Sequence, residues 1–397
     1  MLIYLDNAST TQIDDRVLEA MMPYLQQSYG NAGTLYRLGK DAAMAIDNSR
    51  EQVANLIGAS PEQILFTSGG TESNNMVFIG IKEYLLKINR THIITSQIEH
   101  DSVLRAVKSL CRLKHEFDAE FIAPEHNSGI SSSDVLGAIN KSPDSTGLVS
   151  VMYTNNETGI NNDINAIGNE CKDRGVLFHT DCVQAITCNL INVNDIGCDF
   201  LSLSSHKIHG CKGVGALFAR DKTMLSPLII GGKSQEFGLR GGTENVAGIV
   251  GFGKACEILK QEFEYNSKYV TRRRNQLYGS LSSKLANKGL QDIMHINGNL
   301  DLSSCGKTIN LRFDGIDGET LLLLLDNCGV YVSAGSACRS HSSDPSHVLI
   351  AMGITPEDAR NSIRISLSKQ NTVADVERAA KIIAECVATL AGINNTL

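Results

Sequence analysis

Lys207 lies four residues after an apolar segment, residues 200–203, that we predict to be a buried strand, and Ser205 and His206 come immediately before it. Lysine is seldom buried unless its ammonium group is paired or hydrogen-bonded. One chemical use of a lysine at such a position is to form a Schiff base with an aldehyde. A solvated loop lysine is the alternative that this stretch alone leaves open.

Two other stretches have features of a ligand site. The glycine-rich stretch 68–73 lies between a predicted strand and a predicted helix, where backbone amides and the helix dipole favour an anion. Its spacing matches neither the dinucleotide nor the P-loop glycine motif. Asp181 follows another predicted strand, at the carboxyl edge of the sheet, where α/β proteins bind ligands. A simple turn and a helix-capping carboxylate are the alternatives.

An anion cradle, a sheet-edge carboxylate and a Schiff-base lysine are together the groups that pyridoxal phosphate requires. The carboxylate keeps the pyridine nitrogen protonated, so that the ring can accept electrons, while the lysine holds the aldehyde and moves protons. His100 follows a further predicted strand and could stack on the ring face. A surface or helix-capping role is the alternative for this histidine.

Cys338 lies in a stretch of small and polar residues, 332–345, and its neighbours Arg339 and His341 favour a thiolate. An unreactive surface cysteine is the alternative. The chain has 11 cysteines, which are scattered without a CxxC pair. We therefore expect no disulfide framework and no zinc or other metal site, and we expect a cytoplasmic location. The other cysteines we interpret as structural.

The composition is that of a folded globular protein. The chain has 397 residues, of which 42% are hydrophobic, and this is enough for two packed domains. The formal net charge of −7 lacks the basic excess that nucleic-acid binding requires. No apolar run approaches the ~20 residues of a membrane span, and the N-terminus lacks the features of a signal peptide. We expect binding neither to nucleic acid nor to a membrane.

Short apolar runs alternate with amphipathic stretches through the first 255 residues, which is typical of a mainly parallel sheet covered by helices. After residue 255 the spacing predicts a long polar helix over 257–288 and an amphipathic helix over 373–390 that packs on a smaller sheet. The predicted strands are 64–66, 93–95, 149–153, 176–179 and 200–203, and the predicted helices before residue 255 are 15–25, 71–82, 102–110 and 164–174.

These motifs, taken in order, resemble the cysteine desulfurases of the NifS and IscS type, within the class V aminotransferase group. The resemblance implies the α/β fold type I of pyridoxal-phosphate enzymes. In this fold a large domain, 14–258, contains a mainly parallel seven-stranded sheet, and a smaller α+β domain, 1–13 and 259–397, carries the cysteine loop. The resembling stretches are 4–11, 67–73, 155–159, 179–184, 204–207, 240–243, 335–338 and 362–366.

The resemblance also implies a role for each matching residue. Lys207 would bind the cofactor aldehyde, Asp181 its ring nitrogen and Gln184 its phenolic oxygen. Arg364 would bind the substrate carboxylate through two parallel hydrogen bonds, a geometry that suits arginine. Thr243 would reach the cofactor phosphate of a second subunit, which implies a homodimer. The complete cofactor set is Gly70, Thr71, His100, Asn156, Asp181, Gln184, Ser204, His206, Lys207 and Thr243, and the substrate set is Asn31, Asn156 and Arg364.

The implied reaction removes sulfur from L-cysteine. Lys207 takes the Cα proton, and the Cys338 thiolate attacks the substrate sulfur, which leaves a persulfide on Cys338 and releases L-alanine. A sulfur-acceptor protein would then receive the sulfur for iron–sulfur cluster assembly, tRNA thiolation or DNA phosphorothioation, which the sequence does not distinguish. The alternatives are a selenocysteine lyase, a plain aminotransferase, and a catalytically silent scaffold for sulfur acceptors. The joint presence of Lys207, Asp181, His100 and Cys338 disfavours the scaffold.

The sequence departs from the family pattern mainly in loops. These departures change loop shape and substrate fit, but they keep the chemical groups. They are Ala32, Gly33, Tyr36, Cys182, Ser205 and Cys211.

Overall fold

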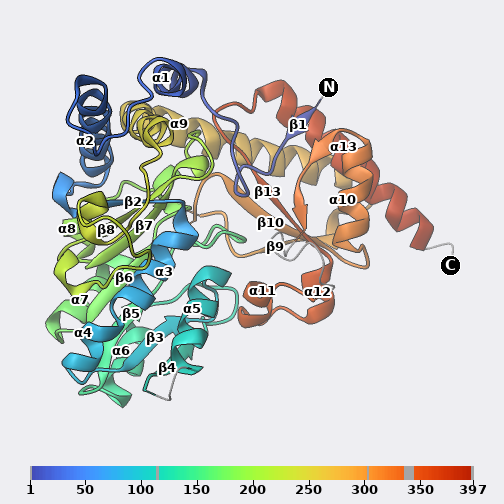
Figure 1. The fold of residues 1–397 in the computed structure, drawn as a ribbon. Helices are drawn as coiled ribbons and strands as arrows, with labels where there is room; N and C mark the ends of the chain where they lie inside the picture. Colours follow the sequence, from blue (N-terminus) through green and yellow to red (C-terminus); the bar gives the residue numbers. More distant parts are fainter. Residues whose placement is uncertain (1, 113–115, 302–303, 335–343, 395–397) are drawn as a thin grey trace.

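The computed structural model describes residues 2–112, 116–301, 304–334 and 344–394. Cys338, Arg339 and His341 lie outside the described residues. Figure 1 shows a larger α/β part, built from the first two thirds of the chain, beside a smaller part built mainly from the C-terminal third.

A seven-stranded sheet forms the centre of the larger part, with the strand order β2-β8-β7-β6-β5-β3-β4. β8 runs antiparallel to β2 and β7, and the other pairs are parallel. The predicted fold class, with a mainly parallel seven-stranded sheet, is therefore confirmed. The strands are β2 (Ile64–Thr67), β3 (His92–Ser96), β4 (Asp118–Ile122), β5 (Thr146–Ser150), β6 (Leu177–Asp181), β7 (Phe200–Ser204) and β8 (Gly215–Ala219).

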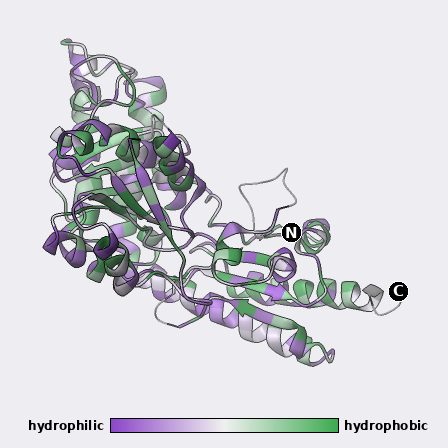
Figure 2. Ribbon diagram, turned by 90° about the horizontal axis from the view of Figure 1, so that it is seen from below, coloured by the Kyte–Doolittle hydropathy of each residue, from purple (hydrophilic) through white to green (hydrophobic). Residues whose placement is uncertain are grey.

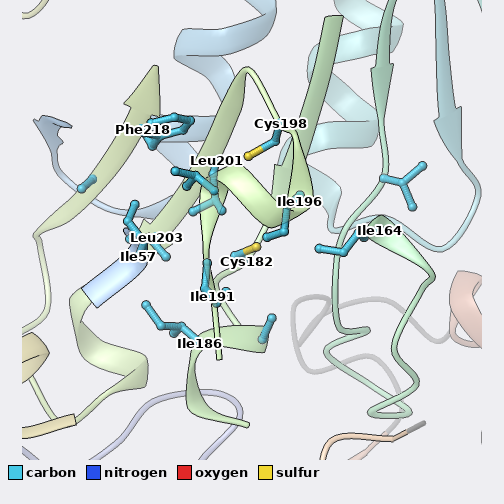
Figure 3. Close-up of a cluster of buried hydrophobic side chains, with 14 of the residues drawn as sticks. Ile57, Ile164, Cys182, Ile186, Ile191, Ile196, Cys198, Leu201, Leu203 and Phe218 are labelled. Carbon is cyan, nitrogen blue, oxygen red and sulfur yellow. The ribbon is translucent and has the colours of Figure 1, made fainter. Parts of the chain in front are cut away.

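Helices cover both faces of this sheet because successive strand residues point to opposite sides. Leu201 and Leu203 of β7 pack toward one face, in a cluster with Phe218 and Ile57 (Figure 3), whereas Phe200 packs toward the other face. The first face is covered by α2 (Arg37–Ile57), α6 (Ser132–Lys141), α7 (Ile164–Asp173) and α8 (Val193–Ile196). The second is covered by α3 (Gly70–Gly80), α4 (Lys82–Lys87) and α5 (Asp101–Arg112).

The smaller part has its own sheet, with the order β12-β13-β10-β9, and its own hydrophobic core. The N-terminal strand β1 (Ile3–Tyr4) pairs with β11 (Val330–Tyr331) and so joins the start of the chain to this part. Figure 2 shows the two parts from below, with hydrophobic and hydrophilic residues mixed along the helix that ends near the C-terminus. The remaining elements are β9 (Met294–Asn297), β10 (Thr308–Phe313), β12 (Ser333–Ala334), β13 (Ser362–Ser366), α10 (Gly318–Asn327), α11 (His347–Ala351), α12 (Pro356–Arg360) and α13 (Val373–Asn394).

The 41-residue helix α9 (Val246–Ala286) packs against α1 (Asp15–Gln26), α2 and α13. It begins eleven residues before the predicted start at 257, in a glycine-rich stretch of low helix propensity. The glycines permit close packing, because a Cβ at Gly251 would lie 2.6 Å from Sδ of Met21 and one at Gly253 would lie 2.8 Å from Cα of Ser49. α9 runs unbroken through the predicted domain boundary at 258/259, and the division of the chain into domains stays a prediction.

Two sequence predictions need correction. The strand predicted at 149–153 is β5 (Thr146–Ser150), because the apolar run continues past the strand end, where Val151 and Met152 are still buried. The sequence predicts no disulfide framework, yet Cys188 and Cys305 form a disulfide across 117 residues of sequence. Scattered spacing carries no signal for a pair that only the fold brings together.

Within the described ranges, none of the helices combines the length and the apolar character that crossing a bilayer requires.

A buried ion pair connects α2 to the loop after β8. Arg50 donates to both carboxylate oxygens of Glu236, at 2.8 and 2.9 Å, and to the carbonyl of Ile64. Glu236 also accepts from the amide of Phe66 at 2.7 Å. Both charged side chains are almost completely buried, so each depends on the other for charge compensation.

We expect Arg50→Met to lower the free energy of unfolding by about 3–5 kcal/mol, because it leaves the Glu236 carboxylate buried without its cation. Urea unfolding checks this, and Arg37→Met at a 95% exposed side chain is the control, with an expected change within about 0.5 kcal/mol. The double variant Arg50→Met/Glu236→Gln should recover part of the loss. An Arg50→Met variant as stable as the control would contradict this account.

Candidate active site

A cavity of about 340 Å³ lies at the carboxyl ends of β6 and β7 and extends to β13 of the smaller part. This is the edge at which open parallel sheets bind ligands. Most of the residues that the sequence singles out meet in its lining: Gly70, Thr71, His100, Asn156, Asp181, Gln184, Ser204, His206, Lys207 and Arg364.

Asp181 is the buried carboxylate of this cavity, with 5% of its surface exposed. Its Oδ1 accepts from the amide of Val183 at 2.9 Å, and its Oδ2 accepts from Nδ2 of Asn74 at 2.8 Å. The same Asn74 nitrogen donates to Oγ of Ser102 at 2.9 Å. Ser102 in turn contacts Nδ1 of His100 at 2.7 Å through its hydroxyl, and its amide donates to that nitrogen. The proton of a neutral His100 ring therefore lies on Nε2.

Lys207 reaches from the exit of β7 to the N-terminal segment. Its Nζ donates to the carbonyls of Ala8 and Ser9, both at 2.7 Å. Nε2 of Gln184 donates to the same Ala8 carbonyl at 2.8 Å. The N-terminal segment thus fixes the amine end of the lysine inside the cavity.

Arg364 enters the cavity from β13. Its Nη2 donates to Oδ1 of Asp6 at 2.8 Å and to Oγ of Ser9 at 2.7 Å, and its Nη1 donates to the carbonyl of Asn156 at 2.9 Å. The side chain is only 5% exposed, so its charge is compensated mainly by Asp6. The guanidinium is held in one orientation at the mouth of the site.

Three polar atoms of these residues fit a polar ligand. Nε of Arg364, Oδ1 of Asn156 and Oε1 of Gln184 are buried and have no hydrogen-bond partner within the described part of the chain. Buried polar atoms are nearly always hydrogen-bonded, so three such atoms around one cavity indicate that a polar molecule completes them. Two of these atoms are acceptors and Nε of Arg364 is a donor, so the molecule that completes them would offer both donors and acceptors.

The opposite end of the cavity has the shape of an anion cradle. Gly70 opens α3, and a Cβ there would lie 2.6 Å from Cγ2 of Val183, so only glycine leaves this space. Gly69 has φ +150°, a conformation that favours glycine. Burial, with the nearby charges of Lys207, Lys212 and Lys307, lowers the pKa of His206 to about 4, so this histidine is a neutral partner at pH 7.

Sequence reasoning missed three residues that hold the site together: Asn74, Ser102 and Glu99. Glu99 is fully buried, and its Oε1 accepts from Oγ of Ser96 at 2.6 Å and from the amide of Met152 at 2.8 Å. Burial raises the pKa of Glu99 to about 8, so it is largely protonated at pH 7. The sequence signal that could have indicated Glu99 is its position directly before His100.

Two predicted residues lie apart from this cavity in the single chain. Asn31 and Thr243 are exposed, and Oδ1 of Asn31 accepts from the amide of Gly33 at 2.8 Å. Their roles stay predictions, as does the role of Cys338 outside the described residues.

Comparison with known proteins identifies the family. Residues 3–379 match the model of the class-V aminotransferases. The chain belongs to this family. The class-V aminotransferases and the cysteine desulfurases among them depend on pyridoxal phosphate, and the cavity's carboxylate, lysine and anion cradle fit that cofactor.

This class-V aminotransferase is similar to curated and solved proteins over nearly its whole length. It is 40% identical to the cysteine desulfurase IscS of Methanosarcina thermophila, over 98% of this chain and 92% of that protein. It is 39% identical to a cysteine desulfurase of Nostoc, over 99% of this chain and 94% of that protein. A solved NifS-like protein has a TM-score of 0.87 at 35% identity, covering 98% of this chain and all of that one. The structure titled SspA in complex with cysteine has a TM-score of 0.77 at 33% identity, covering 93% and 100%.

The protonation of Glu99 gives a prediction for stability. The folded protein keeps a proton on Glu99 that the unfolded chain releases, so between pH 4.5, the ordinary value, and about 8 this group makes the fold less stable as pH rises. Glu99→Gln, which keeps the shape without the titration, should raise the melting temperature more at pH 8 than at pH 5. Scanning calorimetry at both pH values checks this, with the exposed Glu62→Gln as control. A shift in melting temperature that is the same at both pH values would refute it.

Proposed function

We propose that this class-V aminotransferase is a cysteine desulfurase, which takes sulfur from L-cysteine, releases L-alanine and carries the sulfur as a persulfide on Cys338. The observation that carries the proposal is that Asp181 at the end of β6, Lys207 just after β7 and Arg364 in the middle of β13 converge on one cavity. Its relatives named cysteine desulfurase support the same activity.

The residues that would hold pyridoxal phosphate form two groups, one for the ring of the cofactor and one for its phosphate. Asp181 would pair with the ring nitrogen, Gln184 with the phenolic oxygen, and Lys207 with the aldehyde, while His100 would cover the ring face. The phosphate would rest on Gly70, Thr71, Ser204 and His206, with Thr243 from a second subunit. When bound, the cofactor withdraws electrons from the substrate Cα.

The chain's own residues perform the rest of the reaction. Asn74 and the Val183 amide donate to the Asp181 carboxylate and hold it in place. Lys207, oriented by two carbonyls, takes the proton from the substrate Cα when its amine is neutral. Arg364 binds the substrate carboxylate and keeps Cα within reach of that amine. His100 can exchange a proton at Nε2.

Sulfur transfer requires a nucleophile on a segment that can reach the cavity. Cys338 follows β12 in the sequence, and Ser333 of β12 pairs with Arg364 in the small sheet. The segment that leads to Cys338 therefore starts beside the arginine that would bind the substrate. The Cys338 thiolate attacks the substrate sulfur; an S–S bond forms, the C–S bond breaks, and its electron pair stays on the carbon that becomes alanine after protonation.

We also propose a cytoplasmic homodimer that passes the persulfide sulfur to an acceptor protein, for example in iron–sulfur cluster assembly.

Cys338→Ser should keep the visible absorbance of bound pyridoxal phosphate and still bind L-cysteine, yet produce no alanine, because the sulfur has no thiolate to accept it. Alanine analysis and mass spectrometry of the trapped persulfide measure this. The exposed Cys328→Ser is the matched control and should retain activity. A persulfide on Cys182 or Cys328, with Cys338→Ser still active, would refute the assignment.

Arg364→Ala should raise KM for L-cysteine by about 10- to 100-fold, because hydrogen bonds to a charged carboxylate are lost. Titration of the apoprotein with pyridoxal phosphate should change much less. The exposed Arg360→Ala, just before the same strand, is the control. Equal losses of cofactor and substrate affinity would argue against a role in carboxylate binding.

A further inference from the structure

A second, smaller cavity lies next to the active site. It has a volume of about 60 Å³ and shares Lys207 with the larger cavity, while its other walls are different residues. A single water needs roughly 10–15 Å³ of such volume, so this space holds several water-sized groups. Its polar lining includes Asn7, Thr11 and Asn266.

Lys307 lines this cavity and is a buried charge with no assigned role. It lies immediately before β10 and is 6% exposed. Its Nζ has no hydrogen-bond partner within the described ranges. An isolated ammonium is costly to bury, so Lys307 either loses its proton or keeps it beside a partner that the protein chain does not supply.

The surroundings of Lys307 are cationic. Lys207 and Arg364 lie close enough for their charges to disfavour its protonated form, and its own charge acts in the same way on His206 and His209. The residues that line the cavity include Lys207, Lys307, Lys369 and His209 but neither aspartate nor glutamate.

The acidic groups near this cavity are already paired. Lys369 is held by Asp14 at 2.8 Å and Glu262 at 3.2 Å, and Asp6 is paired with Arg364. Among the lysines that line this cavity, Lys307 is therefore the one whose ammonium lacks a compensating contact within the described residues. A small anion would satisfy both its charge and its hydrogen-bonding capacity.

We propose that this cavity binds a small inorganic monovalent anion of halide size, with the Lys307 ammonium as its principal partner. Thr11, Asn7 and Asn266 also line the cavity, but their donors already bond to the carbonyls of His206 and Ser366 and to the Glu262 carboxylate, so the anion depends on the Lys307 ammonium. A halide with one or more waters fits a space of several water-sized positions. A bound anion also reduces the positive field at Lys207, which borders both cavities. The proposal is independent of the desulfurase reaction, and its tests do not measure activity.

The anion should bind more weakly at high pH. Burial and the charges of Lys207 and Arg364 lower the pKa of Lys307 to about 7, and the anion requires the protonated form. Its apparent affinity should therefore fall by about tenfold between pH 6 and pH 8. His206 and His209, whose pKa values burial lowers to about 4, stay neutral throughout this range.

The experiment uses the holoenzyme and bromide as the probe. Crystals soaked in sodium bromide should show an anomalous scattering peak in contact with Nζ of Lys307, and crystals of Lys307→Met should lack it. In solution, sodium chloride should raise the melting temperature of the wild type relative to sodium gluconate at equal ionic strength, more at pH 6 than at pH 8. Lys307→Met should lose this difference.

Lys369→Met is the matched control, because it removes a lysine from the same cavity whose charge is already compensated. It should keep the chloride-dependent shift, with Asp14 and Glu262 still held by Arg16. Lys307→Gln replaces Lys307→Met if the latter does not fold. Water alone at Nζ in the bromide crystals, or a bromide peak that persists without the Lys307 ammonium, would overturn the proposal.

Discussion

The burial of one carboxylate, Asp181, is the constraint on which the rest of the site depends. A carboxylate with 5% exposure needs hydrogen-bond donors in place of the water it has lost. Those donors are the Val183 amide and Asn74, and Asn74 is itself held by Ser102, which fixes the ring of His100. One electrostatic requirement therefore sets the positions of β6, α3 and α5 relative to one another.

The opposite side of the site is organised by cations. Lys207 and Arg364 both turn to the N-terminal segment, where carbonyl oxygens, the Ser9 hydroxyl and the Asp6 carboxylate receive them. Burial keeps the nearby His206 neutral, so positive charge is confined to a few defined atoms. The cavity therefore contains one buried carboxylate, Asp181, and two cationic side chains, Lys207 and Arg364, each held by its own set of hydrogen bonds.

The groups that follow strands could be predicted from the sequence, since the carboxyl ends of parallel strands meet at one edge. Asp181, Lys207 and His100 were found in this way. Asn74, Ser102 and the Cys188–Cys305 disulfide could not be found, because their contacts join segments up to 117 residues apart that carry no local pattern. Lys307 was missed for the same reason: its burial follows from the packing of β10 against residues 366–369, not from its neighbours in sequence. The true start of α9 could not be predicted because glycine in a sequence usually indicates a loop. In α9 the glycines instead allow close packing against neighbouring helices.

The N-terminal segment has a consequence for the order in which the protein is assembled. The amide and side chain of Asn7 bond to the carbonyl of Ser366, 359 residues later in the chain. At the usual pace of synthesis, about 5–20 residues per second, the first residues emerge roughly 20 to 70 seconds before their partner strand exists. The larger sheet can form in that interval, but the carbonyls that receive Lys207 can be fixed only after β13 has been made. The active site can therefore be completed only after most of the chain, through β13, has been synthesised.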